Sequence, residues 1–235
     1  MQNLFSLLKN NPYPGRGLLI GQTTGGEALF AYFIMGRSEN SRNRVFKTKG
    51  QNVYTQAANP ALLIDPSLII YAPVRCVAGG VVVGNGDQTD TIAKFLQQGK
   101  TFEEALRTRT FEPDAPIYTP RISGMIEYKE EEFCYRLSIL KSAASNPDVA
   151  RRFFYEYPQP LKGVGHFIHT YASPTNPLPS FAGEPIEVAI NGNAESFANE
   201  LWQVLDEENK ISLVVRRLQS LAQQKSWLYN KYKEV

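Results

Sequence analysis

The order of strand-like and helix-like segments constrains the fold of this chain more than any other feature. Short apolar or alternating runs typical of strands are GLLIGQ, ALFAYFIMG, RVFKTK, LIIYAPVRCVAGGVVVGNG, ISGMIEYK, EEFCYRLSIL (131–140), GVGHFIHTYA and PIEVAIN. Helical spacing is seen in FSLLKN, DQTDTIAKFLQQG, TFEEAL, AESFANELWQVL and 211–232. The strands come in blocks instead of alternating strictly with helices. This order predicts an α+β protein with antiparallel sheets, not a doubly wound parallel sheet.

Two segments repeat one local pattern. VVVGNGDQTDTIAKFL and VAINGNAESFANELWQVL are each a strand, an Asn-Gly turn and an amphipathic helix. Two such halves packed together would form a four-layer αββα sandwich. The alternative is that strand, turn and helix are simply a common local succession. We expect one domain over residues 1–235, in which 209–235 form an extra C-terminal helix, and we read 146–160 as a short helix or turn.

Composition restricts the environment and the partners. The 235 residues carry 25 basic and 23 acidic side chains, so nothing indicates a nucleic-acid or anionic-membrane surface. No run approaches the roughly 20 apolar residues of a membrane helix. The N-terminal MQNLFSLLKNN lacks the features of a signal peptide, and Cys76 and Cys134 are expected to be free thiols. We therefore expect a soluble cytoplasmic protein.

Familiar catalytic and metal motifs are absent from the sequence. His166 and His169, the two histidines, would point to opposite faces of a strand and could not share one metal. There is no G-x-S-x-G nucleophile motif, and the chain opens with Met1 and a helix. We predict neither a metal site nor a covalent hydrolase of familiar type.

Three polar segments leave a structural and a functional reading open. GNGDQT is either a generic glycine turn or a site that presents Asn85 and backbone N–H groups to a ligand. MGRSENSRNR is either a solvated basic loop or an oxyanion site, to which Arg75 and Arg121 could contribute. Tyr71, in LIIYAPVR, is either a core tyrosine or a site residue.

The connector FEPDAPIYTPRIS is stiffened by three prolines. It places Glu112, Asp114, Thr119 and Arg121 immediately before a strand. Such rigidity would hold these side chains at fixed positions, as one wall of a site. Asp114 is expected to orient a neighbouring arginine.

Taken together, these segments resemble the archaeal-type IMP cyclohydrolases. The resemblance runs from Tyr13 to Val188 through GRGLLIG, GRSENSRNR, YAPVR, VVVGNGDQTDTI, FEPDAPIYTPRISG and IHTY...LPSFAGEPIEV, in that order. It implies an αββα sandwich like that of the N-terminal-nucleophile hydrolases, without an N-terminal nucleophile. It also implies a homo-oligomer.

The resemblance implies an enzyme of purine biosynthesis that needs no cofactor. Members close 5-formamidoimidazole-4-carboxamide ribotide to inosine monophosphate and water, a reaction in which holding two groups together supplies much of the acceleration. Two alternatives remain: an amide-processing hydrolase on the same scaffold, and a non-catalytic purine-nucleotide-binding protein.

Site residues follow from the same resemblance. Tyr71, Glu112 and Arg37 match positions with catalytic roles, in which Tyr71 would donate to the formyl oxygen and Glu112 would accept the carboxamide proton. The matched substrate-binding positions are Ser38, Asn43, Arg44, Asn85, Gly86, Thr119 and Arg121. The chain departs from the family at Gly36, where archaeal members have serine, and at Ala72, where we expect asparagine.

Overall fold

The computed structural model describes residues 1–130, 132–143 and 146–233. Glu131, with which the predicted strand 131–140 begins, lies outside the described residues. So do residues 144–145 and the last two residues of the predicted C-terminal helix, 234–235.

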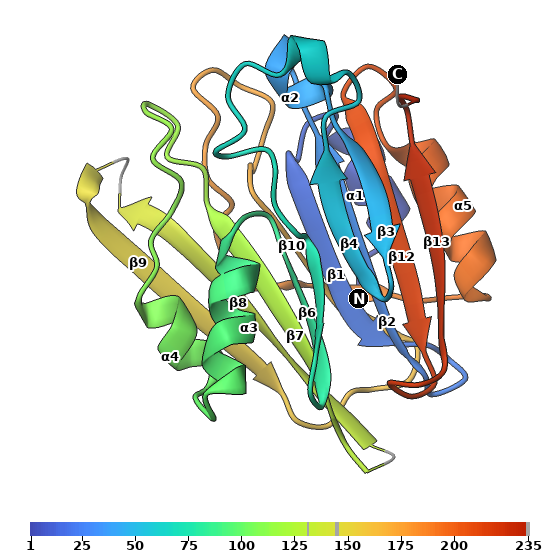
Figure 1. Cartoon of the computed structure of the whole chain (residues 1–235). Helices are drawn as coiled ribbons and strands as arrows, with labels where there is room; N and C mark the ends of the chain where they lie inside the picture. The colour runs from blue at the N-terminus through green and yellow to red at the C-terminus, as the bar shows by residue number, and fades with distance from the viewer. Residues whose placement is uncertain (131, 144–145, 234–235) are drawn as a thin grey trace.

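Within the described residues, the strands form two sheets whose ladders are all antiparallel (Figure 1). The six-stranded sheet has the order β11 (Ile186–Ala189), β10 (Val164–His169), β1 (Arg16–Gln22), β2 (Ala28–Met35), β12 (Lys210–Leu218) and β13 (Gln224–Asn230). The seven-stranded sheet has the order β3 (Val45–Lys49), β4 (Asn52–Gln56), β5 (Val74–Val77), β6 (Gly80–Gly84), β7 (Arg121–Lys129), β8 (Glu132–Ala143) and β9 (Asn146–Tyr157). The prediction of an α+β protein with antiparallel sheets is confirmed.

Helices cover the outer face of each sheet (Figure 1). The helices are α1 (Leu4–Asn10), α2 (Glu39–Arg42), the 3-10 turn η1 (Pro60–Leu62), α3 (Gln88–Gln97), α4 (Phe102–Arg107) and α5 (Ala194–Val204). α1 and α5 pack on the six-stranded sheet, and α3 and α4 pack on the seven-stranded sheet. A capping box opens α4, since Thr101 and Glu104 exchange side-chain to backbone hydrogen bonds.

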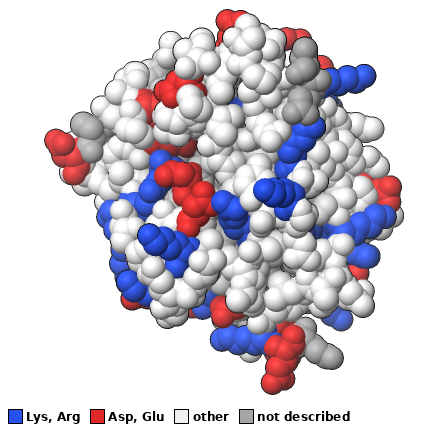
Figure 2. Space-filling view, in the orientation of Figure 1, with Lys and Arg blue, Asp and Glu red and all other residues white. Residues whose placement is uncertain are grey.

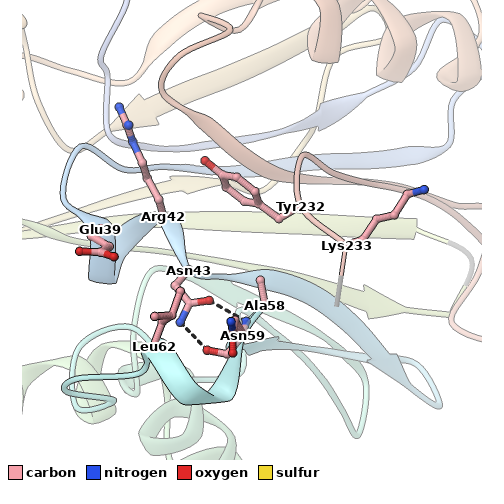
Figure 3. Close-up of a pocket in the computed structure, with 8 residues that line it drawn as sticks. All are labelled: Glu39, Arg42, Asn43, Ala58, Asn59, Leu62, Tyr232 and Lys233. Atoms are coloured by element: carbon pink, nitrogen blue, oxygen red, sulfur yellow. Dashed lines mark hydrogen bonds between the residues drawn. The ribbon is translucent and has the colours of Figure 1, made fainter. Parts of the chain in front are cut away.

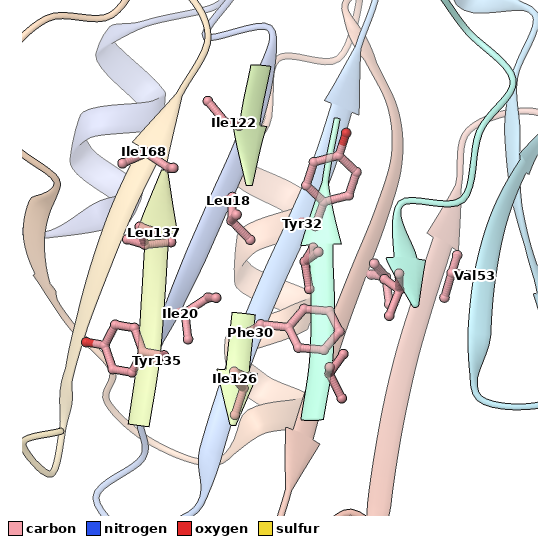
Figure 4. Packing of buried hydrophobic residues seen from close by; sticks show 14 of the residues in the cluster. Leu18, Ile20, Phe30, Tyr32, Val53, Ile122, Ile126, Tyr135, Leu137 and Ile168 are labelled. Carbon is pink, nitrogen blue, oxygen red and sulfur yellow. The ribbon is translucent and has the colours of Figure 1, made fainter. Parts of the chain in front are cut away.

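The largest apolar cluster lies between the two sheets (Figure 4). Every residue of β2 is buried, and successive side chains serve two different cores. Phe30, Tyr32 and Ile34 enter the layer between the sheets, while Phe33 and its alternate neighbours pack under α1 and α5. Burial on both faces explains why ALFAYFIM is a continuous apolar run instead of an alternating one.

The predicted helix over 209–235 is wrong. The segment forms the hairpin of β12 and β13 at one edge of the six-stranded sheet, where β12 pairs with β2. Val214 faces the layer between the sheets, while Leu213 and Val215 face the helices. A strand that is buried on both faces has a continuous apolar run, and such a run also satisfies helical spacing.

The interpretation of 146–160 as a short helix or turn is also wrong, because Asn146–Tyr157 is the edge strand β9. Phe153, Tyr155 and Tyr157 pack against the layer between the sheets, whereas Phe154 packs toward α3 and α4. This alternation is typical of a strand, but the prolines on either side favoured a turn.

Charged side chains on the face shown in Figure 2 are interspersed, with acidic groups lying beside basic ones. This agrees with the near balance of 25 basic and 23 acidic residues. Among the described residues, no helix is both long and apolar enough to cross a membrane.

Candidate active site

Glu112 is the carboxylate at the centre of the candidate site. The connector before β7 folds back on itself, since the Glu112 N–H donates to the Thr119 carbonyl at 2.9 Å. Glu112 as a whole residue is only 1% exposed. Its Oε1 accepts from Asn85 Nδ2 at 3.3 Å, and its Oε2 lies 3.8 Å from Arg16 Nη2.

Burial determines the protonation behaviour of this carboxyl. Loss of solvent raises the pKa of Glu112 to about 7, although the positive charges of Arg16 and Arg121 oppose the rise. Such a group exchanges its proton near neutral pH, so it can act either as an acid or as a base.

Asn85 fixes the turn between β6 and α3. Its Oδ1 accepts from the Ile122 N–H at 2.8 Å and from Gln88 Nε2 at 3.0 Å, while its Nδ2 donates to the Pro120 carbonyl at 2.9 Å. The amide thereby joins the turn to the start of β7 and reaches Glu112. Asn85 is fully buried, and its amide joins the turn to neighbouring protein groups.

Gly86 makes room for Arg121. A Cβ atom at Gly86 would lie 2.3 Å from Arg121 Nη1 and 2.6 Å from Gln88 Oε1. In the structure Arg121 Nη1 donates to Gln88 Oε1 at 2.8 Å and lies 2.9 Å from Asp87 Oδ1. The nearly buried guanidinium is therefore held beside the Asn-Gly turn by protein groups.

Thr119 links the connector to β10 and the residues that follow it. Its N–H donates to Asp114 Oδ1 at 2.7 Å, and its hydroxyl also bonds to Asp114 Oδ2. The same hydroxyl lies 2.7 Å from the Tyr171 hydroxyl, which accepts from Arg16 Nη1 at 3.3 Å. The expectation that Asp114 orients an arginine directly is not met by these contacts, because the carboxylate holds Thr119.

Tyr71 and Arg44 are two further buried residues near Arg16. The Tyr71 hydroxyl is 2.8 Å from the Tyr32 hydroxyl, and both side chains are buried. Arg44 is fully buried, with Nε donating to the Ser41 carbonyl at 2.7 Å and Nη2 to the Met35 carbonyl at 3.3 Å. Its Nη1 has no hydrogen-bond partner among the described residues. Burial lowers the pKa of Arg44, and the positive charge of Arg16 adds to this effect.

The remaining predicted residues lie farther out. Arg37 is exposed, and its guanidinium lies 4.0 Å from the centre of the Tyr13 ring, which in turn stacks on Tyr171. Ser38 caps α2 by accepting from the Ser41 N–H at 3.2 Å. The basic segment therefore has a buried end at Arg44 and an exposed end at Arg37.

The Asn43 side chain bonds to the backbone of the loop that follows β4. Its side chain donates to the Asn59 carbonyl at 2.8 Å and accepts from the Asn59 N–H at 2.7 Å (Figure 3). The two residues line a pocket of about 420 Å³ together with Glu39, Arg42, Ala58, Leu62, Tyr232 and Lys233. This pocket is not lined by Glu112 or Tyr71. The hydrogen bonds of the Asn43 side chain thus go to Asn59.

The buried residues described above are called the buried cluster from here on: Glu112, Asn85, Thr119, Arg121, Tyr71, Arg44, Arg16, Tyr32 and Tyr171. The last three were missed from the sequence. Arg16 stands between two glycines in GRGLLIG, and a charged residue there at the start of a buried strand could have marked it. Tyr32 lies in an apolar run and resembles a core residue. Arg75, considered for the cationic site, instead contacts Asp90 and the Tyr54 hydroxyl.

His169 contacts this cluster through the backbone of Tyr171, whereas His166 and the two cysteines make their contacts elsewhere. His166 Nδ1 lies 2.6 Å from the Tyr135 hydroxyl, whereas His169 Nδ1 lies 2.9 Å from the Tyr171 carbonyl. Their rings are on opposite faces of β10, as predicted from their spacing. Cys76 and Cys134 are free, partly buried thiols.

Comparison with known proteins identifies the family. A family model described as IMP cyclohydrolase-like protein matches residues 13–223, most of the chain. The chain belongs to this family. The match includes Arg16, Tyr71, Glu112 and Tyr171, and it extends beyond the region Tyr13 to Val188 that carried the sequence resemblance.

Curated members of the family support the assignment. The IMP cyclohydrolase of Methanopyrus kandleri is 33% identical over 114 residues, which are 47% of this chain and 57% of the relative. That of Methanocaldococcus jannaschii is 31% identical over 128 residues, 52% of this chain and 59% of the relative. That of Haloarcula marismortui is 31% identical over 118 residues, 48% and 54% of the two chains. The chain thus spans little more than half the length of the curated relatives it matches.

Proposed function

We propose that this protein is an IMP cyclohydrolase that closes 5-formamidoimidazole-4-carboxamide ribotide to inosine monophosphate and water. The observation that carries the proposal is the buried Glu112, with a pKa of about 7, held between Asn85 and Arg16 in a chain of this family. The ring closure needs a group that gives and takes protons near neutral pH, and Glu112 has this property.

The chemistry assigns two successive tasks to such a carboxyl. The carboxamide nitrogen attacks the formyl carbon, forming the C–N bond, and its proton passes to ionised Glu112. The formyl oxygen receives a proton and becomes a hydroxyl, for which the Tyr71 hydroxyl is the proposed donor. Glu112 in its acid form then protonates this hydroxyl, which leaves as water. The proton of the other ring nitrogen returns to the Tyr71 oxygen as the C=N bond forms, so both side chains regain their starting states.

Positioning contributes the larger share of the acceleration in this proposal. Two reacting groups of one molecule, held in contact, can lower a barrier by up to roughly 7–11 kcal/mol. General acid–base help adds about 10²–10⁴-fold. Because Glu112 is 1% exposed, a ribotide can contact it only if neighbouring side chains move aside.

The guanidinium groups fit a ribotide that carries a phosphate. Arg44 keeps one N–H unpaired among the described residues, and Arg37 lies exposed above Tyr13. We assign these arginines, with Arg121, to the anionic and carboxamide groups of the substrate. Among the proposed substrate-binding residues, Ser38 and Asn43 have the least support, because their side chains already bond to protein groups.

The layer order of helices, sheet, sheet and helices supports a further part of the proposal, a likeness to the N-terminal-nucleophile hydrolases without their nucleophile. A cytoplasmic location and a homo-oligomer stay predictions.

The test is the absorbance change on adding the formamido ribotide to purified protein. We expect turnover by the wild-type protein, a loss of about 10²–10⁴-fold in kcat/KM for Glu112→Gln, and a smaller loss for Tyr71→Phe. Binding of the ribotide without turnover would favour a nucleotide-binding protein instead. Hydrolysis of simple amides would favour the amide-processing hydrolase.

A further inference from the structure

A continuous row of polar contacts leads from a partly exposed carboxylate to Glu112. Asp114 accepts both the N–H and the hydroxyl of Thr119. The Thr119 hydroxyl meets the Tyr171 hydroxyl at 2.7 Å, and Tyr171 meets Arg16 Nη1 at 3.3 Å. Arg16 Nη2 then lies 3.8 Å from Glu112 Oε2. Thr119, Tyr171 and Arg16 are all more than nine-tenths buried.

The direction of each hydrogen bond follows from the number of protons available. Thr119 has one hydroxyl proton, and the carboxylate of Asp114 can only accept it. The Tyr171 hydroxyl must therefore donate to the Thr119 oxygen, which leaves its own oxygen free to accept from Arg16. Burial raises the pKa of Tyr171 to about 12, so the hydroxyl keeps its proton. The two hydroxyl protons and one N–H of Arg16 Nη1 thus each meet an acceptor.

Arg16 depends on this row for its orientation. Its Nε is buried without a hydrogen-bond partner among the described residues. The terminal nitrogens contact Tyr171 and Glu112. The Arg16 backbone is anchored separately, with its N–H bonded to the Thr170 hydroxyl at 3.1 Å and its carbonyl to the Thr170 N–H at 3.0 Å. Without the Tyr171 hydroxyl, the side-chain bonds of Arg16 could rotate and move the guanidinium away from its present orientation.

We propose that Tyr171 is a positioning residue that, together with Thr119 and Asp114, holds the guanidinium of Arg16 beside the carboxylate of Glu112. The effect of this arrangement on turnover rests on the proposed function. Its effect on the titration of Glu112 does not, because that titration is measured without substrate.

Several charged groups act on Glu112 from the surrounding elements. Arg16 comes from β1, Arg121 begins β7 and Arg44 precedes β3; all three favour the ionised form. Asp114, in the same connector, opposes it, and Asn85 donates a hydrogen bond. Displacing Arg16 removes the largest of the favourable charges, so the pKa of Glu112 should move upward.

The experiment is an NMR titration of the protein labelled with ¹³C at glutamate side-chain carboxyls, with the Glu112 signal assigned by its loss in Glu112→Gln. We expect Tyr171→Phe and Thr119→Val to raise the midpoint of Glu112 by about one pH unit. Thr119→Ser keeps the hydroxyl and should restore the wild-type midpoint. Tyr128→Phe is the matched control, because it removes a hydroxyl bonded at 2.8 Å to the Leu218 carbonyl on another part of the fold.

An unchanged Glu112 midpoint in folded Tyr171→Phe or folded Thr119→Val would overturn the proposal, as would an equal shift in Tyr128→Phe. The valine variant serves if the phenylalanine variant does not fold. If the midpoints shift as expected but the wild-type protein does not close the ribotide, the positioning role stands and the proposed function fails. If turnover is present, the acidic limb of its pH profile should shift with the midpoint.

Discussion

Arg16 Nη2 lies 3.8 Å from Glu112 Oε2, and both side chains are nearly inaccessible to solvent. The guanidinium does not hold the carboxyl ionised at neutral pH, since burial raises the pKa of Glu112 to about 7 in spite of it. The pair therefore combines an arginine with a carboxyl that is only partly ionised near pH 7. Four predictions test this arrangement and the fold around it.

The stability of the protein should fall with rising pH because of Glu112. The pKa of this carboxyl is about 7 in the folded chain and ordinarily 4.5. The contribution of Glu112 to the free energy of unfolding is fully present below pH 4.5. It is lost as the pH rises through 7, a change of roughly 3 kcal/mol. Urea unfolding should show Glu112→Gln gaining stability relative to wild type between pH 4.5 and pH 8. The exposed Glu184→Gln should show no such gain, and equal curves for both variants would contradict the prediction.

His169 should weaken the fold in acid. Burial lowers the pKa of His169 to about 4 from 6.5, although its hydrogen bond to the Tyr171 carbonyl opposes this. The contribution of neutral His169 to the free energy of unfolding is therefore fully present above pH 6.5. It is lost as the pH falls toward 4, a change of roughly 3 kcal/mol. His169→Gln should flatten this acidic part of the unfolding curve. The idea fails if the variant and the wild-type protein lose stability in parallel from pH 6.5 to pH 4.

Gly86→Ala should impair the site more than the fold. The new Cβ atom would lie 2.3 Å from Arg121 Nη1, so the guanidinium must move. We expect a loss of about 10²-fold in kcat/KM on the formamido ribotide, since a displacement of about 1 Å near the chemistry can have this effect. Gly25→Ala is the control, because its closest neighbour is the flexible end of Glu27 at 3.1 Å. Full activity of Gly86→Ala would show that Arg121 does not need its present position.

Asn230→Ala should destabilise the protein without changing the pH dependence of its activity. Asn230, at the end of β13, accepts from the Phe46 N–H at 2.8 Å and donates to the Phe46 carbonyl at 3.0 Å, joining the edges of the two sheets. Loss of these contacts leaves backbone groups of β3 unpaired and should lower the free energy of unfolding by about 1–3 kcal/mol. Asn199→Ala removes one exposed hydrogen bond, to Tyr229, and should change it by less than about 0.5 kcal/mol. Similar chemical-denaturation midpoints for both variants would count against a joining role.

Elements whose pattern is local could be predicted from the sequence. The hairpin of β1 and β2, the capping box of α4 and the two Asn-Gly turns before α3 and α5 follow from neighbouring residues. The sequence also carried the family resemblance, and through it Glu112, Tyr71 and the buried Arg44. Local periodicity and turn chemistry involve only a few neighbouring residues, so they can be recognised in the sequence without knowledge of the tertiary structure.

Which of these segments contact one another depends on the packing of the whole chain. Asn85 is fully buried and bonded to Glu112, while Asn191, in the same local pattern, is exposed. The run ISLVVRRL is a strand because β2 and β13 pair with it on either side. Arg16 and Glu112 are brought together by the stacking of the two sheets. Burial raises the pKa of Glu112 and favours a strand over a helix in β12. Burial depends on the packing of the whole chain and not on the residues that are adjacent to Glu112 or β12 in the sequence.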